Sequence, residues 1–187
     1  EVHATRRKLE KAKYLEQYGI TLHSDIRETV KDCNVIFFTV KPYQVIPISM
    51  ELGGDLLKDR ICISMAAGLE LSLLEKVTPE LKWIRGMTNT CITIKKGFTV
   101  YATSKMVTEA DEQLVDHLFS TMGYVEKVEE RYMDPLTALS GSGPAYFYTV
   151  IEAMTYGGLR VGIPRDLACK AAAHTAIGAS ELLLYFD

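Results

Sequence analysis

Ser140 and Ser142 alternate with Gly141 and Gly143 directly before Pro144, and this is the most informative segment of the chain. Glycine lets a backbone approach another group closely, and serine adds a hydroxyl donor with little bulk. Proline in the first turn of a helix costs no hydrogen bond, and the free N–H groups of that turn attract anions. The segment therefore suits a small carboxylate or a cofactor tail. The other interpretation of these residues alone is a linker between two elements.

Thr5, Arg6 and Arg7 follow residues that resemble the end of a strand. Dinucleotide-binding folds that prefer NAD usually place an acidic residue after the second strand, where it holds the ribose 2′-hydroxyl. A hydroxyl and two guanidinium groups suit a 2′-phosphate instead, so this segment indicates NADP. The alternative is that the arginines only solvate the start of a helix, although cations there are mildly unfavourable.

Three further groups follow predicted strands, at the sheet edge where α/β folds bind ligands. Lys41, considered by itself, is best interpreted as a solvated lysine at a strand end. Ala67 and its small neighbours would let a flat cofactor ring lie against the backbone, but they also suit a tight turn. Asn89 stands between two threonines and offers a donor and an acceptor, or forms a turn. The candidate residues in these groups are Val40, Lys41 and Pro42, then Met65 and Ala67, then Asn89.

The composition limits the classes of protein to consider. The chain has 187 residues, 48% of them hydrophobic, so it can bury a core in one or two domains. A net charge of −3 and no long basic run argue against nucleic acid as a partner. The apolar runs are shorter than the about 20 residues of a membrane span. Four scattered cysteines and four dispersed histidines predict no metal site and reduced thiols in a cytosol-like compartment.

Strands alternate with helices through the first two thirds of the chain. Apolar and β-branched runs predict strands at 34–40, 60–65 and 82–85, with later strands at 98–102 and 124–128. The first of these runs is continuous enough to predict burial on both faces. Helices are predicted at 6–18, ending at Gly19, at 25–32, at 43–52 and from about 108, and a capping box at 72–75 predicts the start of another. This order predicts a mostly parallel, doubly wound α/β sheet.

The character of the chain changes near residue 131. Strand signals end there, and two long helices rich in Ala, Gly and Leu are predicted at 144–160 and 164–186. We therefore predict two domains, 1–131 and 132–187. Residues 1–4 resemble the end of a strand already under way, and 182–187 stop within an apolar helical pattern. We accordingly expect an internal piece of a longer protein.

Taken together, these motifs resemble the pyrroline-5-carboxylate reductase family over essentially all 187 residues. The matching segments occur in the family's order and spacing. They are 40–42, 66–68, 87–90, 97–102, 139–146, 152–153, 157–158 and 162–165. A single short motif would be a weak signal, but several at family spacing make coincidence improbable.

The resemblance implies an α/β, Rossmann-like doubly wound sheet, incomplete at its start, followed by a truncated all-helical dimerisation domain. It implies hydride transfer from NADPH or NADH to the C=N bond of 1-pyrroline-5-carboxylate, giving L-proline. By position, Thr5, Arg6, Val40, Lys41, Met65 and Ala67 resemble cofactor contacts. Glu130 resembles a position near the substrate, and Asn89 with 140–143 would line the cleft between the domains. The family forms homodimers and larger rings, here expected in the cytoplasm or in the mitochondrion.

Two departures from the family pattern are visible. Ile26 stands where many relatives have an asparagine, and Cys91 replaces the usual proline. The family's Gly-rich pyrophosphate loop and its Pro-Gly-Gly-Thr region are not within the chain, so the catalytic residue stays unassigned. An inactive binding or oligomerising form is therefore one alternative. Another NADP-dependent oxidoreductase of two-domain build is disfavoured, because the helix predicted at 144–160 lacks the lysine such enzymes carry.

Overall fold

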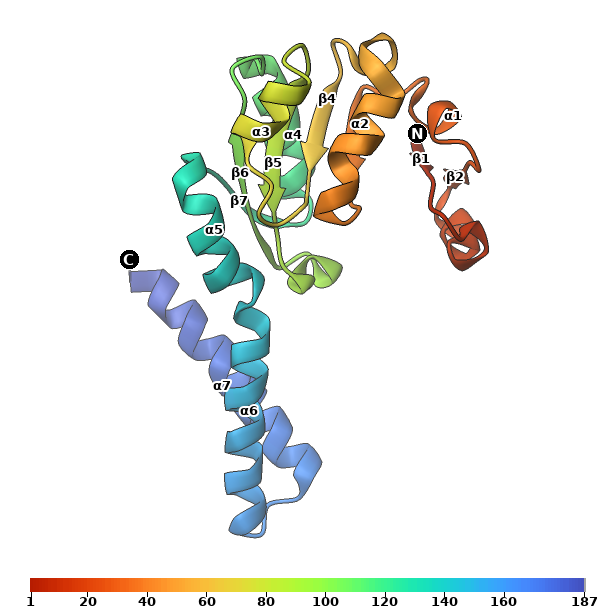
Figure 1. Cartoon of the computed structure of the whole chain (residues 1–187). Coiled ribbons are helices and arrows are strands. Elements are labelled where there is room, and N and C mark those ends of the chain that lie inside the picture. Colours follow the sequence, from red (N-terminus) through yellow and green to blue (C-terminus); the bar gives the residue numbers. More distant parts are fainter. Residues whose placement is uncertain (187) are drawn as a thin grey trace.

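The computed structural model describes residues 1–186, which form a sheet-containing half and a long helical hairpin (Figure 1). A small parallel sheet at the N-terminus pairs β1 with β2 in the register Val2 to Ile20. The main sheet has the order β3-β4-β5-β6-β7, in which only the β5–β6 pair is antiparallel. The strands are β1 (Val2–Ala4), β2 (Ile20–Leu22), β3 (Val35–Phe38), β4 (Ile61–Ser64), β5 (Lys82–Met87), β6 (Gly97–Thr103) and β7 (Gly123–Lys127).

The prediction of a Rossmann-like, mostly parallel sheet is confirmed, with one difference. The sheet is in two pieces, because β1 and β2 make no ladder with β3. β3 is therefore an edge strand, and the prediction that it is buried on both faces is wrong for Phe37, which is 42% exposed. The central strand β4 is buried along its whole length.

Helices cover both faces of the main sheet. Trp83, Phe38 and Met133 belong to the core on the face covered by α2 and α3, whereas Tyr101 and Phe119 belong to the α4 face. The α-helices are α1 (Ile26–Val30), α2 (Pro42–Leu57), α3 (Leu71–Val77), α4 (Glu109–Ser120), α5 (Met133–Leu136), α6 (Gly143–Arg160) and α7 (Arg165–Phe186). The remaining helical elements are the 3₁₀ helices η1 (Leu9–Lys11), η2 (Lys13–Tyr18), η3 (Thr90–Ile94) and η4 (Glu130–Tyr132), and the π-helical turn η5 (Thr137–Gly141).

Two local predictions need correction. Residues 6–18 form two 3₁₀ helices instead of one α-helix, although the predicted end is correct, since Gly19 adopts φ +76°. The predicted capping box at 72–75 is wrong: α3 begins at Leu71, one residue before Ser72, and no side chain of its own segment caps it. A capping box does occur at the start of α4, between Thr108 and Asp111.

The last two helices form an antiparallel hairpin that extends away from the sheet (Figure 1). They lie within a residue of the predicted bounds, and Gly162 makes the turn between them with φ +89°. Among residues 1–186, no helix combines the length and the apolar character needed to cross a membrane.

Candidate active site

The loops that follow the parallel strands β3, β4 and β5 lie side by side at one edge of the main sheet. Lys41 precedes α2, whose first residue is Pro42, and both side chains are exposed. Met65 donates its N–H to the carbonyl of Phe38 at 3.1 Å, which joins the first two loops. Ala67 is exposed in the next loop. The structure therefore brings the predicted groups after β3, β4 and β5 together.

Thr5 and the exposed Arg6 follow β1 in the separate two-stranded sheet. No hydrogen bond between strands joins this sheet to β3 within the described residues. Arg6 forms no ion pair with any described residue. The role of Arg6 as a contact of the cofactor phosphate stays a prediction.

A helical segment, which we call the bridging helix (residues 133–160), joins the two halves through α5, η5 and α6, and only the bend at Ser142 lies outside these three elements. Its π-helical turn is visible in the hydrogen bond from Ser142 N–H to the carbonyl of Thr137, at 3.1 Å. Such turns insert one extra residue into a helix and re-aim nearby carbonyls. The Ser-Gly-Ser-Gly segment therefore joins the end of this π-helical turn to the start of α6 at Gly143, and it is not an extended linker.

Pro144 explains why this turn meets the sheet. In an α-helix the carbonyl of Ser140 would accept from the N–H four residues later, but Pro144 has no N–H. Asn89, at the end of β5, supplies the missing donor: its Nδ2 lies 3.0 Å from the Ser140 oxygen. The Oδ1 of Asn89 accepts from Cys91 N–H at 3.0 Å, which fixes the orientation of the side-chain amide. Asn89 and Ser140 are therefore in direct contact, as expected for residues lining one cleft.

Pro144 lies in the first turn of α6, so the prediction that it opens a helix is confirmed. The turn follows η5 with only Ser142 between them, and Ala145 N–H is already bonded to the Ser142 carbonyl at 3.0 Å, so this N–H group is not free. The hydroxyl of Ser140 donates to the Leu136 carbonyl at 2.8 Å, so its proton is already used. Ser142 is exposed at the same turn. An anion bound here would meet the Ser142 side chain beside the first turn of α6.

Glu130 lies elsewhere, at the start of the segment that leads into the bridging helix. Its Oε1 accepts from Leu71 N–H at 2.6 Å, which caps α3, and from Arg85 Nη1 at 3.2 Å. The second nitrogen of Arg85 pairs with Asp134. Within residues 1–186, no hydrogen bond joins Glu130 to Asn89 or Ser140. The Glu130 carboxylate is thus bound to two donors of the protein itself. The expectation that Glu130 lies near the substrate stays a prediction.

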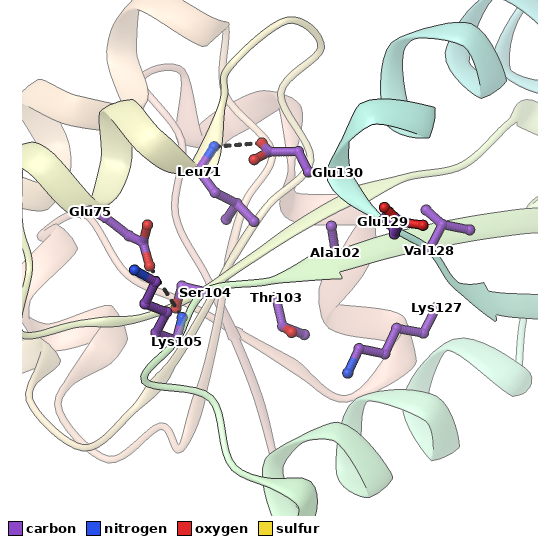
Figure 2. Close-up of a pocket in the computed structure, with 10 residues that line it drawn as sticks. All are labelled: Leu71, Glu75, Ala102, Thr103, Ser104, Lys105, Lys127, Val128, Glu129 and Glu130. Atoms are coloured by element: carbon purple, nitrogen blue, oxygen red, sulfur yellow. Dashed lines mark hydrogen bonds between the residues drawn. The ribbon is translucent and has the colours of Figure 1, made fainter.

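A hollow of about 440 Å³ lies on the same side as Glu130, where β6 ends and β5 begins (Figure 2). Leu71 and Ala102 form its apolar wall, and Figure 2 shows the Glu130 carboxylate turned towards the Leu71 backbone. Of the predicted site residues it contains only Glu130. Asn89 and Ser140, in contrast, meet beyond the other end of β5, so the predicted substrate residues are divided between two places.

Sequence reasoning missed Arg85 and Asp134. Arg85 is charged, yet it stands in a buried strand between Ile84 and Gly86, and its side chain is only 3% exposed. A buried guanidinium needs carboxylate partners, so an arginine within an apolar strand was the available signal. Among residues 1–186, no three His, Cys, Asp or Glu side chains gather as metal ligands.

Comparison with known proteins agrees with this arrangement. Residues 130–186 match the family model described as pyrroline-5-carboxylate reductase dimerisation, and residues 1–68 match that of NADP oxidoreductase, coenzyme F420-dependent. Pyrroline-5-carboxylate reductase 2 of Homo sapiens is 40% identical over 174 residues, which are 91% of this chain and 54% of that protein. The chain belongs to the pyrroline-5-carboxylate reductase family.

Solved structures of the family have the same architecture. The pyrroline-5-carboxylate reductase of Coxiella burnetii superposes with a TM-score of 0.89 at 28% identity, covering 98% of this chain and 69% of that chain. The Plasmodium falciparum pyrroline carboxylate reductase, solved with NADP bound, gives 0.82 at 29% identity, covering 88% and 63%. The chain thus spans about half the length of the mammalian relatives that it matches.

Proposed function

We propose that this protein acts as a pyrroline-5-carboxylate reductase and forms L-proline, the last step of proline biosynthesis. The observation that carries the proposal is the contact of Asn89 with Ser140, which places the family's Ser-Gly-Ser-Gly turn at the carboxyl edge of the sheet. Ligands of open α/β sheets bind at that edge. The alternatives, an inactive binding or oligomerising form and another NADP-dependent oxidoreductase, have no comparable observation in their favour.

We infer that the cofactor is NADPH, with NADH as the weaker donor. Thr5 and the unpaired guanidinium of Arg6 suit the 2′-phosphate. The other contacts are assigned to exposed residues after β3 and to two residues after β4, near Gly68, which adopts φ +69° and leaves open space. These residues are Val40, Lys41, Pro42, Met65 and Ala67. When bound, the reduced nicotinamide supplies a hydride to the imine carbon.

Reduction of a cyclic imine needs little covalent help from a protein. The hydride brings two electrons to the carbon, the π pair of the C=N bond moves to nitrogen, and that nitrogen takes a proton. The chain's contribution is to hold the imine against the sheet edge and to anchor its carboxylate. We assign that anchor to Ser142, with Ser140 and Asn89 shaping the turn and Glu130 supporting it from a distance. No proton donor is assigned among the described residues.

We also propose that the protein forms a homodimer or a larger homo-oligomer through α6 and α7. The two helices expose large apolar side chains along their length, which the described residues leave uncovered. Among them are Tyr146, Phe147, Val150, Ile177, Leu183 and Phe186, each more than half exposed. The four cysteines are all free thiols, which supports a reducing compartment, the cytoplasm or the mitochondrial matrix.

Oxidation of NADPH in the presence and absence of the imine tests the proposed activity. We expect imine-dependent oxidation, and Arg6→Ala should raise the Michaelis constant of NADPH about tenfold while changing that of NADH little. Ser142→Ala should raise the Michaelis constant of the imine more than Ser140→Ala, because the Ser140 proton is held by Leu136. Equal losses for both cofactors would reject the 2′-phosphate assignment. Unchanged Michaelis constants in both serine variants would reject the anchor.

A further inference from the structure

Arg85 occupies an unusual place for a charged residue. It stands in the middle of β5 with its side chain 3% exposed, and it is the only charged residue of the described core. A guanidinium in such a place loses its hydration, and it is tolerated only when carboxylates replace the lost water. Both partners come from one short segment, Glu130 and Asp134, and both contacts are charge-assisted.

Glu130 adds a third element to this cluster. The same Oε1 that pairs with Arg85 at 3.2 Å accepts from Leu71 N–H at 2.6 Å. α3 has no capping side chain of its own, so this contact replaces the cap that its sequence lacks. We call Arg85, Glu130 and Asp134 the Arg85 clamp. It joins β5, the N-terminus of α3 and the start of the bridging helix.

The position of the clamp along the chain allows it to influence the orientation of the turn that carries Ser140. Met133, between its two carboxylates, is fully buried in the core, so the start of the bridging helix is held in place. The helix then runs unbroken to Ser140, where Asn89 of the same β5 segment contacts it. β5 and the loop after it therefore contact the bridging helix at two points, through Arg85 and Asn89, which are four residues apart in the sequence. Two contacts define the direction of a helix where one would leave it free to pivot.

The clamp reaches the predicted cofactor side through α3. Leu71 is buried and follows the loop at 66–68, which carries the exposed Ala67. Movement of Glu130 would release the first N–H of α3 and with it the end of this loop. Arg85 is thus linked through Glu130 to the loop at 66–68 and through Asp134 to the helical segment that carries the turn at 137–141.

We propose that Arg85 is a positioning residue, which through Glu130 and Asp134 aligns the turn carrying Ser140 with the loop carrying Ala67. It touches neither substrate nor cofactor. The kinetic part of this inference rests on the proposed function, whereas the conformational part does not.

Hydrogen exchange measured by mass spectrometry on the purified protein tests the conformational part. Arg85→Met should speed exchange about tenfold at the Leu71 amide and in the segment 137–142, since breaking one side of a buried ion pair is costly. Arg85→Lys keeps the charge but not the two-pronged geometry, so it should restore part of the protection. Arg131→Met is the matched control: its pair with Glu129 is exposed, and exchange should stay as in the unchanged protein.

A second control separates positioning from general loss of stability. Val115→Ala removes a fully buried side chain from the α4 face, away from the clamp. It should speed exchange in α4 and leave 137–142 protected. Equal acceleration of 137–142 by Val115→Ala and Arg85→Met would overturn the proposal, and so would an unchanged segment in Arg85→Met. If Arg85→Met fails to fold, Asp134→Asn decides, because Asp134 is largely exposed: faster exchange in 137–142 supports the clamp and no change rejects it.

Steady-state kinetics tests the other part. Arg85→Met should raise the Michaelis constants of NADPH and of the imine together, about fivefold or more, because the clamp bears on both sides of the site. A change in only one of them would reject coupled alignment. If the unchanged protein forms no L-proline, the proposed function fails, while the exchange measurements still decide the clamp.

Discussion

The sheet half and the helical hairpin bury their apolar side chains in different ways. Trp83, Tyr101 and Phe119 are fully buried between β-strands and helices of the same chain. In the hairpin, Tyr148 is 63% and Leu183 67% exposed. The sheet half thus supplies its own hydrophobic stabilisation, whereas the described residues leave much of the hairpin's apolar surface uncovered.

The cause lies in the residues through which the two helices meet. α6 and α7 approach each other over small side chains, with Gly158 next to Ala168 and with Ala172 buried nearby. Small residues allow a close approach but bury little area. The large residues are left on the outer faces of the two helices. This agrees with the finding that residues 130–186 match a family model for dimerisation.

The largest expected effect contrasts one core residue with one hairpin residue. Trp83→Ala should lower the free energy of unfolding by about 3–5 kcal/mol, because it leaves a cavity and removes the donor to the Thr78 hydroxyl. Phe147→Ser should change it by less than about 1 kcal/mol in dilute protein, yet weaken self-association. Denaturant titration and analytical ultracentrifugation measure the two quantities. If both changes destabilised dilute protein equally, the contrast between a self-covered sheet half and an uncovered hairpin would be wrong.

A smaller effect tests the close approach inside the hairpin. A Cβ at Gly158 would lie 2.9 Å from the Ala168 Cβ, so Gly158→Ala should cost about 1–3 kcal/mol through overpacking. Gly157→Ala is the matched control, since nothing lies within 4 Å of a Cβ at Gly157. That change should stabilise the helix by up to about 1 kcal/mol. Thermal unfolding of both variants checks the signs, and two equal results would contradict this packing.

The smallest effect concerns Asp111, which caps α4 on the sheet half. Burial acts to raise the pKa of this carboxyl, but hydrogen bonds from Lys82 and Thr108 outweigh it and the pKa is lowered. A carboxyl whose pKa is lowered in the folded state stabilises the fold at a pH above its ordinary pKa. This stabilisation is lost as the pH falls through the pKa of the folded state. Asp111→Asn should therefore cost about 1 kcal/mol at pH 7 and progressively less below about pH 4. Glu109→Gln in the same turn serves as control, and a pH-independent difference would contradict the assignment.

Much of the fold was predictable because it follows local patterns. The alternation of apolar runs with helical segments located all five strands of the main sheet, and Gly19 marked a true helix end. The two long helices were placed within a residue, since Gly162 and the following proline interrupt them. The antiparallel β6 and the split of the sheet depend on contacts between distant segments, and no local pattern encodes them.

The site was predictable in its residues but less so in its geometry. Pro144 stands in the first turn of α6, as its local signal indicates, but that signal does not reveal the π-helical turn before it. That turn depends on Asn89, which supplies the donor that Pro144 lacks. Ser72 likewise satisfied the capping pattern, but the acceptor for α3 is Glu130, far along the chain. Partners distant in sequence decided both cases.

The central proposal is that this protein delivers a hydride to a cyclic imine at the edge of its sheet. The most direct test incubates it with 1-pyrroline-5-carboxylate and NADPH deuterated at the transferred position, and analyses the product by mass spectrometry and NMR. The account predicts L-proline with one deuterium on the former imine carbon, formed in the unchanged protein and strongly reduced in Asn89→Ala. L-proline without deuterium, or no L-proline at all, would contradict it.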